Sequence, residues 1–215
     1  MIRDTAERLL RGEFICSTVC PEAYRDLTEP ETRAKVEAIL APLNRKISET
    51  ANKAAYYATW ISLELSEDRA SVKKEFQTVM EQLRPVLEFI LLVMDASTRD
   101  HPMMPGSQVT EAELTARVQN NQYLTTRAKK INTLLNKRPQ TEVPEIIRII
   151  IDRMVKYEIL RENVPGTRIF TFTGKVDYIY EVLEFIDAHE NILAEEEKAL
   201  EQQKQKPEEE DLFSS

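Results

Sequence analysis

The chain has 215 residues, of which 42% are hydrophobic and 31% charged, and it contains only four glycines. This length is enough for one large domain or two small ones with buried cores, and the scarcity of glycine favours helix. The formal net charge of −8 argues against a simple nucleic-acid coat, and Cys16 and Cys20 are too few for a disulfide framework.

Charge is distributed unevenly along the sequence. The tail from Ala194 to Ser215 carries eight acidic residues against three lysines, whereas Glu111 to Arg138 carries six bases against two acids. We therefore expect a near-neutral body with a basic middle and an acidic tail. The most apolar run, Val86 to Met94, is far shorter than the ~20 residues that cross a bilayer. Because Met1 to Gly12 has no signal-peptide core, we expect a cytoplasmic protein that does not contact membranes.

Short helices and then strands are predicted near the start of the chain. Asp4 is placed to cap a helix that ends near Arg11, and another helix is expected from Pro21 to Leu27. Thr28 to Glu31 has the pattern of a capping box that opens a further helix, up to about Leu43. Strand-like runs follow at Arg45 to Glu49 and Tyr56 to Leu63.

The middle of the chain is predicted to be helical on both sides of a loop. Helices are expected from about Asp68 to Arg84 and from Leu83 to Ala96, the second apolar on nearly all sides and therefore buried. Ser97 to Ser107 is predicted to be a loop. Thr110 to Glu113 again has the pattern of a capping box and opens the next helix. The basic segment Thr125 to Arg138 follows.

A helix, a hairpin and a helix are predicted after the basic segment. Apolar residues recur on one helical face from Val143 to Tyr157, and Thr141 is placed to cap this helix. Strands are expected over Ile159 to Asn163 and Arg168 to Thr173. Pro165-Gly166 between them suits a type II turn, because glycine supplies the positive φ that this turn requires. An amphipathic helix from about Val176 to Ile186 follows.

Both halves of the chain therefore share an order of helices followed by a hairpin. A helical triad closed by a two-stranded wing is the layout of a winged helix, a variant of the helix-turn-helix. We predict a mainly α protein with small β-hairpins (α+β), built from tandem winged-helix domains. The predicted parts are an N-terminal winged helix (1–66), connecting helices (67–96), a C-terminal winged helix (97–193) and an acidic disordered tail (194–215).

Few residues are arranged for catalysis. Histidine occurs only at His101 and His189, and Cys16 and Cys20 have no second Cys or His pair to complete a zinc site. Four glycines leave little room for a phosphate-binding loop. We expect no enzyme, no cofactor and no metal. The remaining catalytic interpretation, a site in the loop around His101, predicts loss of activity in His101→Ala.

Two features predict contacts with other macromolecules. On the Val143–Tyr157 helix, Ile149 and Arg153 lie among charges of both signs, a face that fits a protein partner better than base readout, although single exposed apolar residues are common. The basic segment either contacts phosphates without reading sequence or is a solvated helix face. Its predicted phosphate contacts, with one from the wing, are Arg127, Lys129, Lys130, Lys137, Arg138 and Arg168.

The acidic tail is expected to begin as a helical extension and to be disordered after Pro207. Its last residues place Leu212 and Phe213 after an acidic run. Such a segment can dock on a basic, grooved partner, or it can simply increase solubility.

Two stretches carry a resemblance to a known family. The first stretch, Arg8 to Leu27, reads RLLRGEFICSTVCPEAYRDL and has an apolar helix, a glycine, a short turn and a helix with Tyr and Leu. The other stretch, Lys156 to Thr173, reads KYEILRENVPGTRIFTFT and is expected to form the second wing. On these residues, over about Ala6 to Asp187, the sequence resembles the KITE subunits of bacterial SMC complexes. Among them it is most similar to the MksE and MukE type.

The resemblance implies a homodimer that binds a kleisin subunit (MksF-like) and, through it, an SMC ATPase (MksB-like) in a condensin-like complex. Such a subunit is nucleoid-associated, contacts DNA weakly and non-specifically, and supports chromosome organisation and segregation or plasmid defence. Tyr57 and Trp60 could then form a dimer or kleisin surface, or pack within a wing. The alternative is a dimeric winged-helix transcription regulator, which predicts tight binding to a particular operator.

Overall fold

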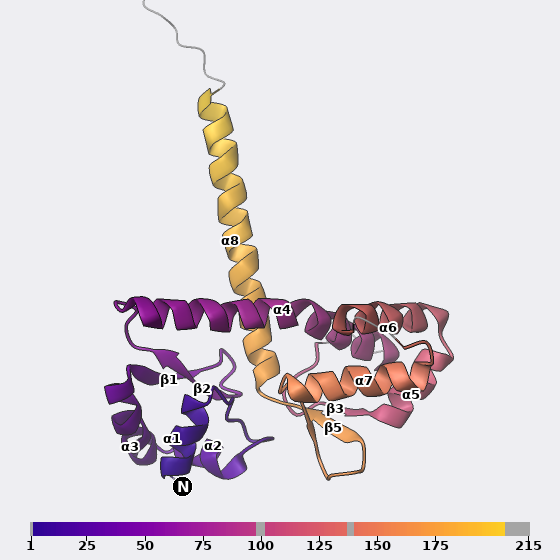
Figure 1. The fold of residues 1–215 in the computed structure, drawn as a ribbon, viewed down its shortest axis with the longest axis horizontal. Coiled ribbons are helices and arrows are strands. Elements are labelled where there is room, and N and C mark those ends of the chain that lie inside the picture. Colours follow the sequence, from indigo (N-terminus) through magenta and orange to yellow (C-terminus); the bar gives the residue numbers. More distant parts are fainter. Residues whose placement is uncertain (1, 98–101, 137–139, 205–215) are drawn as a thin grey trace, which may run out of the picture. The chain divides into compact units, whose positions relative to one another are not determined.

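The computed structural model describes residues 2–97, 102–136 and 140–204, the last 15 of these by their backbone alone. The chain forms two compact units, Met1–Ile179 and Tyr180–Ser215. It is mostly helical with small antiparallel sheets (Figure 1), which confirms the predicted α+β class.

Helices surround a hairpin in the N-terminal part of the first unit. The elements are α1 (Ile2–Leu10), α2 (Pro21–Thr28), α3 (Pro30–Leu40), the 3-10 turn η1 (Ala41–Leu43), β1 (Arg45–Glu49) and β2 (Tyr56–Trp60). The strands pair antiparallel with Ile47 opposite Ala58, and Ile15, between α1 and α2, forms an isolated bridge to Tyr56. The apolar faces of the helices meet the hairpin in one core, where Leu9, Ile15, Leu27 and Leu40 are fully buried.

A single continuous helix, α4 (Ser66–Ser97), replaces the separate helices predicted around residue 84. Its interior contains Pro85, which removes one backbone hydrogen bond at a cost of about 3 kcal/mol. The helix continues because Val86, Phe89 and Leu92 bury their side chains completely just beyond the proline. Burial on all sides was wrong for Leu91, whose side chain is 41% exposed.

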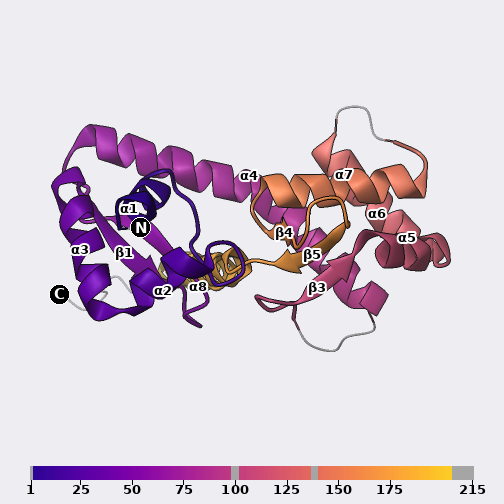
Figure 2. The same ribbon diagram turned by 90° about the horizontal axis from the view of Figure 1, so that it is seen from below.

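The C-terminal part contains β3 (Gln108–Thr110), α5 (Glu111–Gln119), α6 (Gln122–Leu135), α7 (Val143–Lys156), β4 (Leu160–Glu162), β5 (Ile169–Phe172) and the start of α8 (Lys175–Lys204). The strands form an antiparallel sheet in the order β3-β5-β4 (Figure 2), with Val109 opposite Phe170. The sequence did not predict β3, because only Val109 of its three residues is buried and no alternation is visible. The hairpin and the turn at Gly166, with φ +86°, are confirmed.

The same pairing order occurs in both parts. In the N-terminal part, Ile15 lies between two helices and pairs with β2, the second strand of the hairpin, which pairs with β1. In the C-terminal part, β3 lies between α4 and α5 and pairs with β5, the second strand of its hairpin, which pairs with β4. The likeness between the two halves therefore extends beyond element order to strand pairing.

Most of the predicted helix caps are wrong. Asp4 lies inside the first turn of α1 and pairs with Arg8, and Thr28 ends α2, its hydroxyl donating to the Tyr24 carbonyl. Thr110 is the N-cap residue of α5, as expected, but its side chain makes no capping hydrogen bond, and Thr141 lies one residue before the N-cap of α7. Proline stands at the first position of α2 and α3 and at the second position of α7, where its fixed φ is already helical.

Within the first unit, the start of α8 packs closely against the N-terminal part. A Cβ on Gly174 would lie 2.6 Å from both the Ala54 carbonyl oxygen and the Ala55 Cβ, so only glycine fits there. Asp177, 2% exposed, accepts hydrogen bonds from the backbone N–H and the side-chain amide of Asn52. These contacts join the β1–β2 turn to the first turn of α8. The second unit is described as the continuation of α8 to Lys204.

Candidate interaction surfaces

An apolar stripe runs along the solvent side of α4. Phe76, Met80 and Leu91 are 43%, 39% and 41% exposed, and Leu87 is half-buried. They lie on one helical face because their spacings of four and seven residues are close to whole turns. A groove of about 370 Å³ follows the stripe. Its lining residues are Met80, Leu83, Arg84, Leu87, Glu88 and Leu91.

Sequence reasoning missed this stripe because it divided α4 near residue 84. The apolar spacing continues through that point from Phe76 to Leu91, and this signal could have revealed both the continuous helix and its exposed face. Single exposed apolar side chains are normal, but a row of them beside a groove is typical of a contact surface.

Two bases of the basic segment pair with carboxylates of α4. On α6, Arg127 forms ion pairs with Glu88 and Asp95, and Lys130 pairs with Glu88. The hydrogen bond from Lys130 holds the pKa of Glu88 below its usual value, with Arg127 adding to the effect. Lys129 is exposed and forms no ion pair with the residues that the structure describes. Lys137 and Arg138 lie outside the described residues.

Arg168 connects the β4–β5 hairpin to two helices. Its guanidinium donates to Glu111 of α5 at 2.6 Å and to Asp152 of α7 at 2.8 Å, and lies over the Phe170 ring. Glu162 accepts the backbone N–H groups of Gly166 and Arg168 across the hairpin turn. The predicted phosphate contact Arg168 therefore already has two carboxylate partners within the chain.

The exposed face of α7 has the mixed character expected from the sequence. Ile149 and Arg153 are both half-buried, and the Arg153 guanidinium lies 6.0 Å from the centre of the Tyr157 ring. The opposite face is fully buried and anchors the helix in the core. Its buried residues are Ile146, Ile147, Ile150, Ile151 and Met154.

Tyr57 and Trp60 lie in different surroundings. The Tyr57 ring packs against Phe14 at 5.1 Å and Tyr178 at 5.2 Å, in the contact between the N-terminal part and α8. Trp60, half-buried at the end of β2, is covered by the Arg45 guanidinium. The use of either residue as a partner contact stays a prediction. Leu212 and Phe213 lie outside the described residues.

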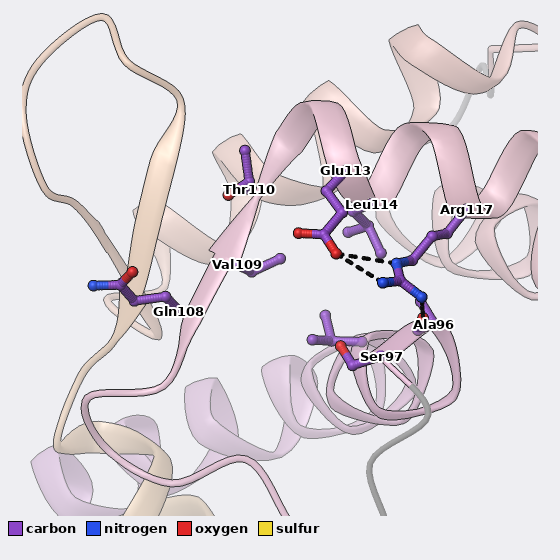
Figure 3. Close-up of a pocket in the computed structure, with 9 residues that line it drawn as sticks. Ala96, Ser97, Gln108, Val109, Thr110, Glu113, Leu114 and Arg117 are labelled. Carbon is purple, nitrogen blue, oxygen red and sulfur yellow. Dashed lines mark hydrogen bonds and ion pairs between the residues drawn. The ribbon is translucent and has the colours of Figure 1, made fainter.

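A small polar cavity of about 150 Å³ lies where the end of α4 meets β3 and α5 (Figure 3). Arg117 points into this corner, where it donates to the Ala96 carbonyl oxygen at 2.9 Å and pairs with Glu113 at the same distance. A cation at the end of a helix donates hydrogen bonds to the last carbonyl oxygens, which have no partner within the helix. It also interacts favourably with the negative end of the helix dipole. Arg117 thus secures the C-terminal end of α4.

The described ranges offer neither a metal site nor a membrane-spanning helix. They contain no group of three or more His, Cys, Asp and Glu side chains that could hold a metal ion. No described helix is long and apolar enough to span a bilayer. Both cysteines are free thiols, and burial raises the pKa of Cys20, which disfavours its reactive thiolate. His101 lies outside the described residues.

The fold is mostly helical α+β, and its notable surfaces are an apolar helix stripe and mixed-charge faces. Such surfaces are typical of a protein that acts by contacting other macromolecules. A family model described as condensin complex protein MksE matches residues 2–183. The chain belongs to this family, which confirms the resemblance found in the sequence, and it is a subunit of a condensin-like complex. No curated protein matches it.

Proposed function

We propose that this chain is a non-enzymatic KITE subunit of a condensin-like SMC complex, which dimerises and binds the kleisin subunit. Through the kleisin it joins the SMC ATPase, which supplies the chemistry, so the chain itself needs no cofactor. Its membership of the MksE family supports this role in chromosome organisation and segregation or plasmid defence. The family match gives no support to the alternative, a transcription regulator.

The repeated strand pairing is the observation that carries the proposal. Ile15–β2–β1 and β3–β5–β4 have the same order, each with helices before a hairpin. That order supports tandem winged helices at residues 1–66 and 97–193, joined through 67–96 and followed by the acidic tail, 194–215. The proposed partner contacts in this arrangement are Ile149 and Arg153 on α7, Trp60 on β2, and Leu212 and Phe213 in the tail. Tyr57 is the least favoured candidate for a partner contact, because its ring already packs between two other rings.

DNA binding is proposed to be weak and indifferent to sequence, as suits a nucleoid-associated subunit. Arg127, Lys130 and Arg168 already pair with carboxylates, so binding phosphate would require breaking those pairs. Lys129 is the exposed cation of α6 best placed for phosphate, and Lys137 and Arg138 follow it in the sequence. Contacts of this kind position a protein on DNA without specifying bases.

Co-purification tests the proposal. The tagged chain is co-expressed with a kleisin candidate from the same genome, and the complex is washed in high salt. We expect the kleisin to be retained by the wild type and reduced by the pair Ile149→Asp and Arg153→Glu. Lys129→Glu, on another helix, is the matched control and should retain it. Loss of the kleisin from the wild type, together with tight binding of one DNA sequence, would instead support the regulator.

A further inference from the structure

The apolar stripe of α4 is not covered by the other described elements of the first unit, Met1–Ile179. Phe76, Met80 and Leu91 are each about two-fifths exposed, and the stripe is roughly 22 Å long at ~1.5 Å per residue. The other side of the same helix holds Phe89 and Leu92 fully buried in the core. The half of the stripe around Leu87 and Leu91 therefore lies on the anchored part of the helix, whose buried residues begin at Leu83.

The spacing of the stripe reads the same in both directions. Phe76, Met80, Leu87 and Leu91 are separated by four, seven and four residues, so the pattern is symmetric about the point between Leu83 and Arg84. If two copies of α4 lie antiparallel about a two-fold axis at that point, Phe76 faces Leu91 of the second copy and Met80 faces its Leu87. A two-fold interface requires a self-complementary surface of this kind.

The charges beside the stripe fit the same arrangement. Glu81 and Arg84 flank it on one side, three residues apart and close to the symmetry point. Antiparallel pairing brings Glu81 near Arg84 of the second copy, and the axis generates this contact twice. Arg84 forms no hydrogen bond or ion pair within the described ranges, and the contact found for Glu81 is a 3.5 Å one from Gln77. In a parallel two-fold pair the two copies of this flank lie on opposite sides of the interface, so the Glu81–Arg84 contact is not formed.

We propose that α4 is the homodimer interface, and that its occupant is a second copy of this chain with the two α4 helices antiparallel. This inference rests on the homodimer of the proposed function and specifies where and in which orientation it forms. The groove along Met80, Leu87 and Leu91 is the surface that the second copy fills.

Cysteine cross-linking tests the orientation in the full-length chain. Under mild oxidation, a mixture of Met80→Cys and Leu87→Cys chains should give a species of twice the 24.9 kDa monomer mass on a non-reducing gel. Each variant alone should give little, because residue 80 faces residue 87 of the second copy. The parent chain, with Cys16 and Cys20 only, is the control. Efficient cross-linking of each variant with itself would show a parallel pair and overturn the inference.

Charge reversal and light scattering test the interface itself. Met80→Asp is expected to raise the dimer dissociation constant roughly 30-fold or more, as removal of a central contact does. Arg84→Glu should weaken the dimer, and Glu81→Arg combined with Arg84→Glu should restore it. Leu43→Asp, at a side chain 53% exposed outside the stripe, should leave the dimer intact. Circular dichroism verifies that each variant remains folded.

The outcomes separate this inference from the proposed function. A dimer that persists in Met80→Asp and Arg84→Glu overturns the α4 interface and leaves the proposed homodimer standing. A dimer that persists while Met80→Asp loses the kleisin shows that the groove takes a partner helix, which also overturns it. A monomeric wild type that still binds the kleisin removes the homodimer and this interface together, but not the kleisin-binding role.

Discussion

Asp177 in the first turn of α8 accepts two hydrogen bonds from Asn52, a residue 125 positions earlier in the β1–β2 turn. The backbone N–H of Asn52 lies 3.1 Å from one carboxylate oxygen and its side-chain amide 2.5 Å from the other. Asp177 is only 2% exposed, so its carboxylate depends on these donors in place of water. This pair and the close approach at Gly174 hold the N-terminal part against the start of α8.

Asn52→Ala should therefore destabilise the protein although residue 52 is on the surface. It removes the side-chain donor and leaves a buried carboxylate with a single hydrogen bond from residue 52, a loss of about 1–3 kcal/mol. Urea denaturation followed by circular dichroism measures the change. Asn120→Ala, at an exposed position after α5, is the matched control and should change the free energy of unfolding by less than about 0.5 kcal/mol. Equal effects of the two variants would contradict this reading of the Asn52–Asp177 pair.

Gly174→Ala should be more damaging than Gly166→Ala. At Gly174 the added Cβ would meet the Ala54 backbone at 2.6 Å, so the two parts must move apart, at a cost of about 1–3 kcal/mol. At Gly166 the added Cβ would meet no described heavy atom within 4 Å apart from its chain neighbours, and the positive φ alone costs about 1–2 kcal/mol. Thermal melts compare the two variants. If Gly166→Ala lowers the melting temperature more, the contact at Gly174 is looser than described.

The hairpins and most helices could be predicted because short-range patterns determine them. The apolar face of α7 and the turn at Gly166 are both visible in a few consecutive residues. Long-range pairing is not visible in this way: the bridge of Ile15 and the strand β3 depend on partners more than 40 residues away. The continuity of α4 through Pro85 likewise depends on burial beyond the proline, which outweighs the local signal.

The candidate contact residues show the same limit. A count of bases predicted a phosphate-binding segment on α6, but it could not show that Glu88 and Asp95 of α4 already neutralise Arg127. The exposed stripe of α4 was missed because two helices were expected around residue 84, and the second, Leu83 to Ala96, was expected to be buried. Composition indicates which charged or apolar residues could contact a partner, and only the packing shows which of them have no contact within the chain.

Glu88 should make stability depend on pH in the acid range. Lys130, and Arg127 after it, hold its pKa in the folded protein below the ordinary value of 4.5. The group therefore stabilises the fold fully above that value, and this contribution is lost as the pH falls through the lower folded pKa. Glu88→Gln should lower stability at pH 7, and the difference from wild type should shrink below about pH 4.5. Lys130→Ala should reduce the same difference, and a gap that stays constant with pH would contradict the assignment.

Arg168 and Lys129 should separate fold stability from DNA affinity. Arg168→Ala removes two partly exposed ion pairs and is expected to lower stability by about 1 kcal/mol, with little change in DNA affinity. Lys129→Ala should leave stability unchanged and reduce non-specific DNA binding, together with the slope of its salt dependence. Denaturation curves and fluorescence anisotropy with random-sequence duplexes measure both. A large loss of DNA affinity in Arg168→Ala would mean that its ion pairs open on DNA.

Light scattering coupled to size exclusion tests the central claim most directly, on the chain alone and co-expressed with a kleisin candidate from the same genome. We expect the chain alone to have the mass of a dimer, and the co-expressed pair to elute as one peak of stoichiometric mass. Separate elution of the two proteins, each with its own mass, would contradict a kleisin-binding role for this subunit.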